Sequence, residues 1–127
     1  MNEMRDRKKR VLLADDQSSV RSALRLLIDH NPEFEILGEA VDFVTLFDWV
    51  KSCCPDVVLL DWELPDFGGK ASLTLLRQHC PHLTIIALSG RPEAQQMALN
   101  AGADAFFSKG DPPEWLLQTV CAVSAGR

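Results

Sequence analysis

The sequence has no hydrophobic run near the roughly 20 residues that cross a lipid bilayer, so it predicts no membrane span. The first ten residues are charged and lack the apolar stretch of a secretory signal, so we expect no signal peptide. There are four cysteines, but no CxxC pair and no histidine at zinc spacing, which argues against a zinc site. We therefore expect reduced, partly buried thiols in a cytoplasmic protein.

The chain also lacks the basic excess of a nucleic-acid-binding domain. It has 18 acidic and 13 basic residues, a net charge of -5 at pH 7. Five of the basic residues but only two of the acidic ones lie in residues 1–10, so residues 11–127 hold eight basic and sixteen acidic side chains. This balance argues against direct binding to DNA, which we expect only through a separate output domain absent from these 127 residues.

Short apolar runs alternate with amphipathic stretches along the whole chain. Strand patterns occupy residues 11–14, 35–41, 57–60, 84–88 and 103–107, and helical patterns occupy residues 18–29, 43–53, 71–80, 93–101 and 111–123. Asp111 is expected to cap the last helix, with Pro112 at its first position. Strict alternation predicts a single α/β domain with a parallel sheet covered by helices on both faces. We expect residues 1–9 to be a disordered basic leader, residues 10–124 the domain, and residues 125–127 a frayed end or the start of a linker.

Polar side chains follow four of the predicted strands where each strand ends. Asp15 and Asp16 follow the first strand, Asp61 the third, Ser89 the fourth and Lys109 the fifth. Each has a bland alternative, since an Asp can cap a helix or form a turn and a lysine can be a solvated amine. Ligands of open parallel sheets bind at the carboxyl ends of the strands. Three carboxylates brought together there repel one another, and a hard cation such as Mg²⁺ relieves that repulsion. The group therefore predicts a site that handles phosphoryl groups.

Four motifs carry a family resemblance. They are LADDQ at residues 13–17, VVLLDWELP at 57–65, LSG at 88–90 and GADAFFSKG at 102–110. In this order and spacing, from about residue 10 to residue 123, the sequence resembles the receiver domain of two-component response regulators. The resemblance implies a flavodoxin-like (βα)5 fold with strand order 2-1-3-4-5.

The resemblance also implies roles for the residues at the strand ends. Asp61 would be the phosphoacceptor, taking a phosphoryl group from the phosphohistidine of a sensor histidine kinase. Asp16 and Asp61 would bind Mg²⁺, Asp15 would reach it through water, and the backbone carbonyl of Glu63 would supply another ligand. Lys109 would pair with the phosphoryl oxygens.

Two further positions match the family's conformational switch. Ser89 would hydrogen-bond a phosphoryl oxygen, and Phe106 would then turn inward, changing the face formed by residues 93–123. Lys109 followed by Gly110 looks like the LuxR/NarL-type subgroup, whose receivers precede a helix-turn-helix domain and regulate transcription. Homodimerisation on phosphorylation is plausible for such a protein, although no apolar stripe in the sequence identifies the face.

Glu63 and Arg91 each lie two residues beyond a site residue, Asp61 and Ser89 respectively. Both are expected to flank the path of an attacking water. Our hypothesis is that they pair across the site and slow hydrolysis of the phosphoaspartate, although exposed ion pairs often contribute little.

Other classes fit less well. A Mg²⁺-dependent phosphatase with an aspartyl-phosphate intermediate would want an Asp rather than Glu63 two residues after the nucleophile. A flavin-binding module would need a phosphate-cradling loop after the first strand, where Asp15 and Asp16 would repel a phosphate. A degenerate receiver would not need all five polar residues, whereas a stand-alone signalling module without DNA-binding output remains an alternative. We expect no enzymatic activity beyond the domain's own phosphorylation and dephosphorylation.

Overall fold

The computed structural model describes residues 7–125, in which five strands alternate with five helices. The strands are β1 (Lys9–Ala14), β2 (Phe34–Ala40), β3 (Val57–Asp61), β4 (Thr84–Ser89) and β5 (Ala105–Ser108). The helices are α2 (Ser18–Asp29), α3 (Phe43–Cys53), α4 (Lys70–His79), α5 (Ala94–Ala101) and α6 (Pro113–Ala125). No helix in this part of the chain combines the length and hydropathy that crossing a membrane requires.

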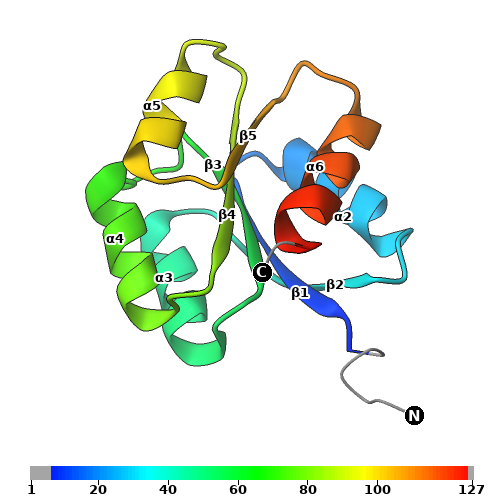
Figure 1. Ribbon diagram of the computed structural model, residues 1–127, viewed down its shortest axis with the longest axis horizontal. Coiled ribbons are helices and arrows are strands. Elements are labelled where there is room, and N and C mark those ends of the chain that lie inside the picture. The colour runs from blue at the N-terminus through cyan, green and yellow to red at the C-terminus, as the bar shows by residue number, and fades with distance from the viewer. Residues whose placement is uncertain (1–6, 126–127) are drawn as a thin grey trace.

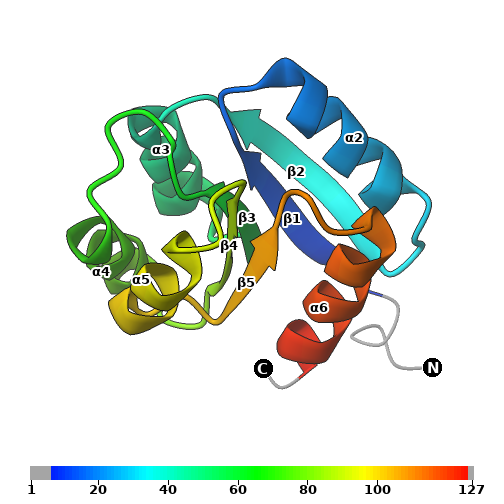
Figure 2. The same ribbon diagram turned by 90° about the horizontal axis from the view of Figure 1, so that it is seen from above.

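The strands form one parallel sheet in the order β2-β1-β3-β4-β5, which confirms the expected topology. Helices α3, α4 and α5 cover one face of the sheet, and α2 and α6 cover the other (Figures 1 and 2). The three layers follow from the alternation in the sequence, because each helix crosses over between parallel strands.

Burial on both faces explains why the central strands are apolar. Every residue of β3 and β4 is buried, and so are the last four residues of β1. Along each strand, alternate side chains enter two separate hydrophobic clusters, one under α3–α5 and one under α2 and α6. The two clusters hold the sheet rigidly between the helices, so the strand ends are fixed relative to one another.

The expected helix and strand boundaries are close to those observed, with small shifts. Strand β1 begins at Lys9, which pairs with Phe34, so part of the expected leader belongs to the sheet. Residues 7 and 8 of the expected leader form no regular structure, and Ala125 of the expected tail is the last residue of α6, whereas residues 1–6 and 126–127 lie outside the described residues. Helix α6 begins at Pro113, so Pro112 is not its first residue and Asp111 does not stand at the expected capping position.

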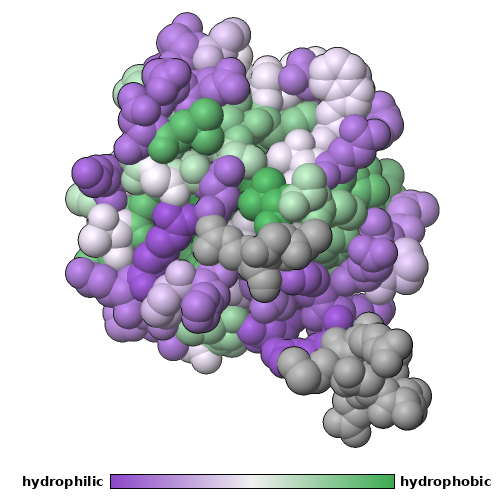
Figure 3. Space-filling model, viewed as in Figure 1, coloured by the Kyte–Doolittle hydropathy of each residue, from purple (hydrophilic) through white to green (hydrophobic). Residues whose placement is uncertain are grey.

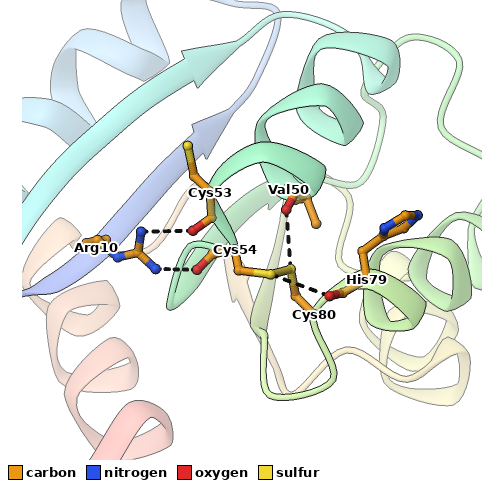
Figure 4. Close-up of a disulfide and its surroundings, with 6 residues drawn as sticks. All are labelled: Arg10, Val50, Cys53, Cys54, His79 and Cys80. Atoms are coloured by element: carbon orange, nitrogen blue, oxygen red, sulfur yellow. Dashed lines mark hydrogen bonds between the residues drawn. A yellow bond between two sulfur atoms is a disulfide. The ribbon is translucent and has the colours of Figure 1, made fainter.

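The expectation of four reduced thiols is wrong for one pair. Cys54 and Cys80 form a disulfide with Cα atoms 5.6 Å apart, while Cys53 and Cys121 are free (Figure 4). The two half-cystines stand directly after α3 and α4, which pack side by side, so the disulfide joins the ends of two neighbouring helices. The 26-residue separation in sequence gave no sign of this proximity.

Arg10, on β1, binds the end of α3 beside the disulfide. Its guanidinium donates hydrogen bonds to the backbone carbonyls of Cys53 and Cys54 (Figure 4). Cys54 has a left-handed backbone conformation with φ of 42°, which ends α3 and turns its carbonyl toward Arg10. Helix α3 is thereby fastened both to α4 and to the sheet.

Candidate functional site

The polar residues predicted at the strand ends gather at one edge of the sheet. Asp61 and Ser89 are the last residues of β3 and β4, while Asp15 and Lys109 directly follow β1 and β5. Backbone hydrogen bonds continue the ladder past the strands, from Lys109 N to Ser89 O at 2.9 Å and from Trp62 N to Leu88 O at 2.8 Å. Regular parallel pairing therefore sets the spacing between these side chains.

Three carboxylates form the acidic part of the site. Ligand atoms of Asp15, Asp16 and Asp61 lie within 4.8 Å of one another. Asp15 and Asp61 are buried, whereas Asp16 is exposed. Neither Asp15 nor Asp16 caps α2, whose cap residue is Gln17, so the helix-cap alternative for these two aspartates fails. Instead, Oδ1 of Asp15 accepts a hydrogen bond from the Gln17 amide at 2.9 Å.

Asp61 is held from two sides. Its Oδ1 accepts a hydrogen bond from the Glu63 amide at 3.0 Å and lies 3.5 Å from Nζ of Lys109. Burial is the largest influence on its pKa, which is raised above the ordinary 3.8, and repulsion by Asp15 adds to that effect. The Glu63 amide and Lys109 act in the opposite direction and favour the ionised form.

Lys109 is the positive group of the site. Its Nζ lies 2.7 Å from Oδ2 of Asp15 as well as near Asp61. Burial alone would lower the pKa of this lysine, but the direct contact with Asp15 and the attraction of both carboxylates outweigh it, so the pKa is raised. Lys109 is therefore a charged ammonium in the site.

The donor set fits a divalent cation. Oδ2 of Asp15 is buried, and within residues 7–125 it has no hydrogen bond of good geometry, only the ammonium of Lys109 beside it. One ammonium leaves three adjacent carboxylates with an excess of negative charge. Clustered carboxylate oxygens with one member open to solvent suit Mg²⁺, which prefers hard oxygen ligands and retains several waters.

Ser89 and Glu63 make a contact that the sequence did not predict. The buried Ser89 hydroxyl donates to both carboxylate oxygens of Glu63, at 3.0 and 3.1 Å. Arg91 instead forms an ion pair with Glu93 at 3.5 Å, and its amide donates to Ser89 Oγ at 3.0 Å. The expected pairing of Glu63 with Arg91 is therefore wrong for this conformation, because Ser89 is the nearer partner of the Glu63 carboxylate.

Phe106 lies on β5, three residues before Lys109. It is partly buried and packs against the hydrophobic cluster under α3–α5, whereas its neighbour Phe107 faces the other cluster. The ring of Phe106 is thus on the face of the sheet that α5 covers, and α5 is the helix directly before β5 in the chain.

Arg21 is a residue of the site region that sequence reasoning missed. Its Nη1 donates to the backbone carbonyl of Asp15 at 2.8 Å, and its Nε donates to Glu39 at 2.7 Å. Arg21 thereby fixes the loop that carries Asp15 and Asp16. The sequence did not indicate this role, because Arg21 is one basic residue in the first turn of a helix and one of its two partners is a backbone carbonyl.

The fold and site together define a class: an open α/β domain with carboxylates, an amine and a hydroxyl at the carboxyl edge of its sheet. A family model described as the response regulator receiver domain matches residues 11–121. The chain belongs to this family.

Curated relatives extend the likeness to longer proteins. The chain is 37% identical over 107 residues to a protein-glutamate methylesterase/protein-glutamine glutaminase of Pyrococcus abyssi, covering 81% of this chain and 29% of that protein. It is 30% identical over 118 residues to the nitrate/nitrite response regulator protein NarL of Escherichia coli, covering 91% and 55%. The chain thus spans from under a third to about half the length of these relatives.

Solved structures agree. A LuxR-family two-component response regulator from Aurantimonas is 29% identical with a TM-score of 0.86, covering 95% of this chain and 88% of that one. The receiver domain of a NarL regulator from Mycobacterium tuberculosis is 25% identical with a TM-score of 0.84, covering 94% and 98%. In sequence and fold the chain is therefore similar to receivers of the NarL and LuxR type.

Proposed function

We propose that the domain is a phosphorylation switch in which Asp61 accepts a phosphoryl group from the phosphohistidine of a sensor histidine kinase. The observation that carries this proposal is the position of Asp61, a buried carboxylate at a strand end, close to both Lys109 and Asp15. An Asp61 oxygen forms the new bond to phosphorus while the phosphorus–nitrogen bond breaks, and the imidazole nitrogen keeps the electron pair.

Asp15, Asp16, Asp61 and the backbone carbonyl of Glu63 would hold Mg²⁺. When bound, the ion supplies positive charge that offsets the carboxylates and the oxygens of the transferring group. Lys109 contributes a second positive charge, and its ammonium is already placed between two carboxylates. The Glu63 amide orients the Asp61 carboxylate through its hydrogen bond.

Ser89 and Phe106 would convert phosphorylation into a change of shape. Ser89 turns its hydroxyl to a phosphoryl oxygen, and Phe106 moves into the space that this opens. The face formed by α5, β5 and α6 would change with it. Hydrophobic surface is visible between α5 and α6 (Figure 3). Met97 of α5 and Trp115 of α6 are 55% and 53% exposed. We propose this face as the contact of a phosphorylation-dependent homodimer.

Glu63 and Arg91 remain candidates for setting the lifetime of the phosphoaspartate. Both are exposed and lie two residues beyond Asp61 and Ser89, so we expect them to flank the approach of a water. Replacing each by Ala separately and following dephosphorylation tests this role. An unchanged rate in both variants would exclude it.

The output we propose is transcriptional, through a helix-turn-helix domain outside these residues. The support is the likeness to NarL, of which this chain covers 55%, and to a LuxR-family regulator. Residues 11–127 hold sixteen acidic and eight basic side chains, a balance that does not favour DNA binding by the receiver itself. A histidine-kinase partner and such an output would place the protein in the cytoplasm.

The deciding experiment is phosphorylation by a small donor. The protein is incubated with acetyl phosphate, with and without Mg²⁺, and its intact mass is followed. We expect the added mass of one phosphoryl group only when Mg²⁺ is present.

Two variants locate the modified residue. Asp61→Asn should abolish the added mass, while Asp66→Asn should leave it unchanged. Asp66 is a matched control because it is exposed in the loop after β3, and its positive φ of 65° suits Asn. Modification that needs no Mg²⁺, or that survives Asp61→Asn, would refute the assignment.

A further inference from the structure

The hydroxyl of Ser89 has only one hydrogen, and in this structure Ser89 already donates it in a hydrogen bond. It is shared between Oε1 and Oε2 of Glu63, at 3.0 and 3.1 Å from Oγ. The Arg91 amide donates to the same Oγ at 3.0 Å, so Ser89 is engaged both as donor and as acceptor. Ser89 is fully buried at the end of β4, which makes these partners the ones that satisfy it.

We propose that Glu63 is a latch that holds the Ser89 hydroxyl away from Asp61 and must release it before the domain can reach its phosphorylated conformation. The inference rests on the proposed function, since it concerns the same hydroxyl and the same phosphoacceptor. Glu63 acts through Ser89 and is a positioning residue, separate from any role of its backbone carbonyl.

Competition for a single hydrogen gives the latch its physical basis. A phosphoryl oxygen on Asp61 needs the hydrogen that the Glu63 carboxylate now accepts, and Ser89 cannot serve both. The bond to Glu63 is charge-assisted and hence stronger than a bond between neutral groups.

Glu63 is well placed to couple the two residues. Its amide donates to Asp61 Oδ1 at 3.0 Å while its side chain accepts from Ser89, so a single residue touches both the nucleophile and the hydroxyl. Glu63 is itself exposed, and its carboxylate can therefore swing into water and keep its hydration. The latch can open without stranding a buried charge, which a buried glutamate could not do.

Calorimetric titration with beryllofluoride in the presence of Mg²⁺ tests the latch. The full chain is compared with Glu63→Ala, with Glu63→Asp, and with Glu35→Ala as a control for loss of one charge. Glu35 is exposed near the start of β2, at the opposite end of the sheet. We expect Glu63→Ala to bind about tenfold more tightly, as for release of one charge-assisted hydrogen bond, and Glu35→Ala to bind like the wild type.

The Glu63→Asp variant separates the hydrogen bond from the charge. Aspartate keeps the negative charge but is one methylene shorter and does not span the distance to Ser89. Tighter binding in both Glu63 variants supports the latch. Tighter binding in Glu63→Ala alone attributes the effect to charge and overturns it.

A double-mutant cycle with Ser89→Ala supplies a second criterion. Without the hydroxyl there is nothing to release, so Glu63→Ala should change beryllofluoride affinity less than twofold in that background. An equal gain with and without Ser89 would overturn the latch.

A ligand-free measurement distinguishes failure of the latch from failure of the proposed function. The Arg91 amide donates to Ser89 Oγ, so its nitrogen and proton chemical shifts report the orientation of the hydroxyl. In the latch, this resonance moves in Glu63→Ala and in Glu63→Asp but not in Glu35→Ala, whether or not beryllofluoride binds. If the wild type binds no beryllofluoride, the phosphoacceptor proposal fails. If the Arg91 amide resonance does not move in either Glu63 variant, the latch fails but the phosphoacceptor proposal does not.

Discussion

Asp61 illustrates how a functional side chain can weaken the fold that holds it. Its carboxylate is buried beside Asp15, and its pKa is raised above the ordinary 3.8. The folded protein therefore binds a proton at this site more readily than the unfolded chain does. At a pH above the raised pKa, ionisation of Asp61 therefore lowers the free energy of unfolding. This loss shrinks as the pH falls and is gone below the ordinary pKa of 3.8.

Asp61→Asn should therefore raise the free energy of unfolding at pH 7, by an amount on the order of 1 kcal/mol. Urea unfolding without Mg²⁺ at pH 7 and near pH 3.5 measures the difference, which should shrink at the lower pH. The matched variant Asp16→Asn should gain less, because Asp16 is exposed. An Asp61→Asn protein less stable than wild type at pH 7 would contradict this account.

Gly38 is a residue whose importance comes only from its neighbour. A Cβ at this position would lie 2.4 Å from the ring of Trp49, far inside contact distance. Gly38→Ala should lower the free energy of unfolding by about 1–3 kcal/mol, since overpacking forces the ring or the strand to move. Gly90→Ala, where a Cβ would meet nothing within 4 Å, serves as the control in thermal unfolding and should be near neutral. Equal effects of the two substitutions would exclude the clash as the cause.

At the scale of elements, Glu39 fastens β2 to α2. It accepts hydrogen bonds from Arg21 at 2.7 Å and Arg25 at 2.8 Å, which lie one helical turn apart. Hydrogen bonds from Arg25 and Arg21 hold the pKa of Glu39 below the ordinary 4.5 despite its partial burial. The stability that Glu39 contributes is present above pH 4.5 and is lost as the pH falls through the lowered pKa.

Glu39→Gln should thus cost about 1 kcal/mol at pH 7, a modest value because Arg25 and Glu39 are partly solvated. Denaturant unfolding at pH 7 and pH 3 tests this, and the difference from wild type should be smaller at pH 3. Glu35→Gln, on the same strand but exposed, is the control. A loss that does not depend on pH would point to packing rather than charge.

The disulfide between the ends of α3 and α4 is the second link between elements. It closes a loop of 26 residues around β3 and α4, and such a loop restricts the unfolded chain. Reduction should lower the free energy of unfolding by about 3 kcal/mol. Calorimetry with and without reductant measures this, and Cys54→Ser should make the protein insensitive to reductant.

Alkylation followed by intact mass checks the pairing itself. Unfolded without reductant, the chain should expose two reactive thiols, Cys53 and Cys121, and all four after reduction. Four reactive thiols before reduction would show that Cys54 and Cys80 are not joined.

At the scale of the molecule, we expect the edge of the sheet formed by β5, with α5 and α6 beside it, to respond to phosphorylation, and the opposite edge formed by β2 to stay fixed. Beryllofluoride with Mg²⁺ should alter amide hydrogen exchange mainly in α5, β5 and α6. Exchange in β2 and α3 should change less, since they lie away from Ser89 and Phe106. A uniform slowing throughout the chain would indicate stabilisation by binding alone, without a local switch.

Much of the fold could be predicted because it depends on local patterns. The bounds of α2 and α3 follow directly from apolar periodicity, and the burial of β3 and β4 follows from their runs of consecutive apolar residues. Boundaries that depend on tertiary contacts were less accurate. Strand β1 begins at Lys9 because β2 is there to pair with it, which the charged sequence around Lys9 did not indicate.

The candidate site was predictable for a topological reason. Parallel strands end at the same edge, so residues that follow the strands must meet, and Asp15, Asp61 and Lys109 do so. What they touch in detail was not predictable. The partner of Glu63 is Ser89 rather than Arg91, because side-chain rotamers and loop conformation decide between two groups that lie only two positions apart in the chain.

The sequence by itself determined the α/β architecture, the family and the gathering of carboxylates, lysine and hydroxyl at one edge, because periodicity and strand order are properties of the chain. Only the tertiary structure decided the Cys54–Cys80 disulfide, the fit of Gly38 under Trp49 and the capture of the Ser89 hydrogen by Glu63. Each of these is a contact between residues at least 11 positions apart, in different helices, strands or loops. Its existence depends on distances of a few ångströms, which packing sets and no local pattern encodes.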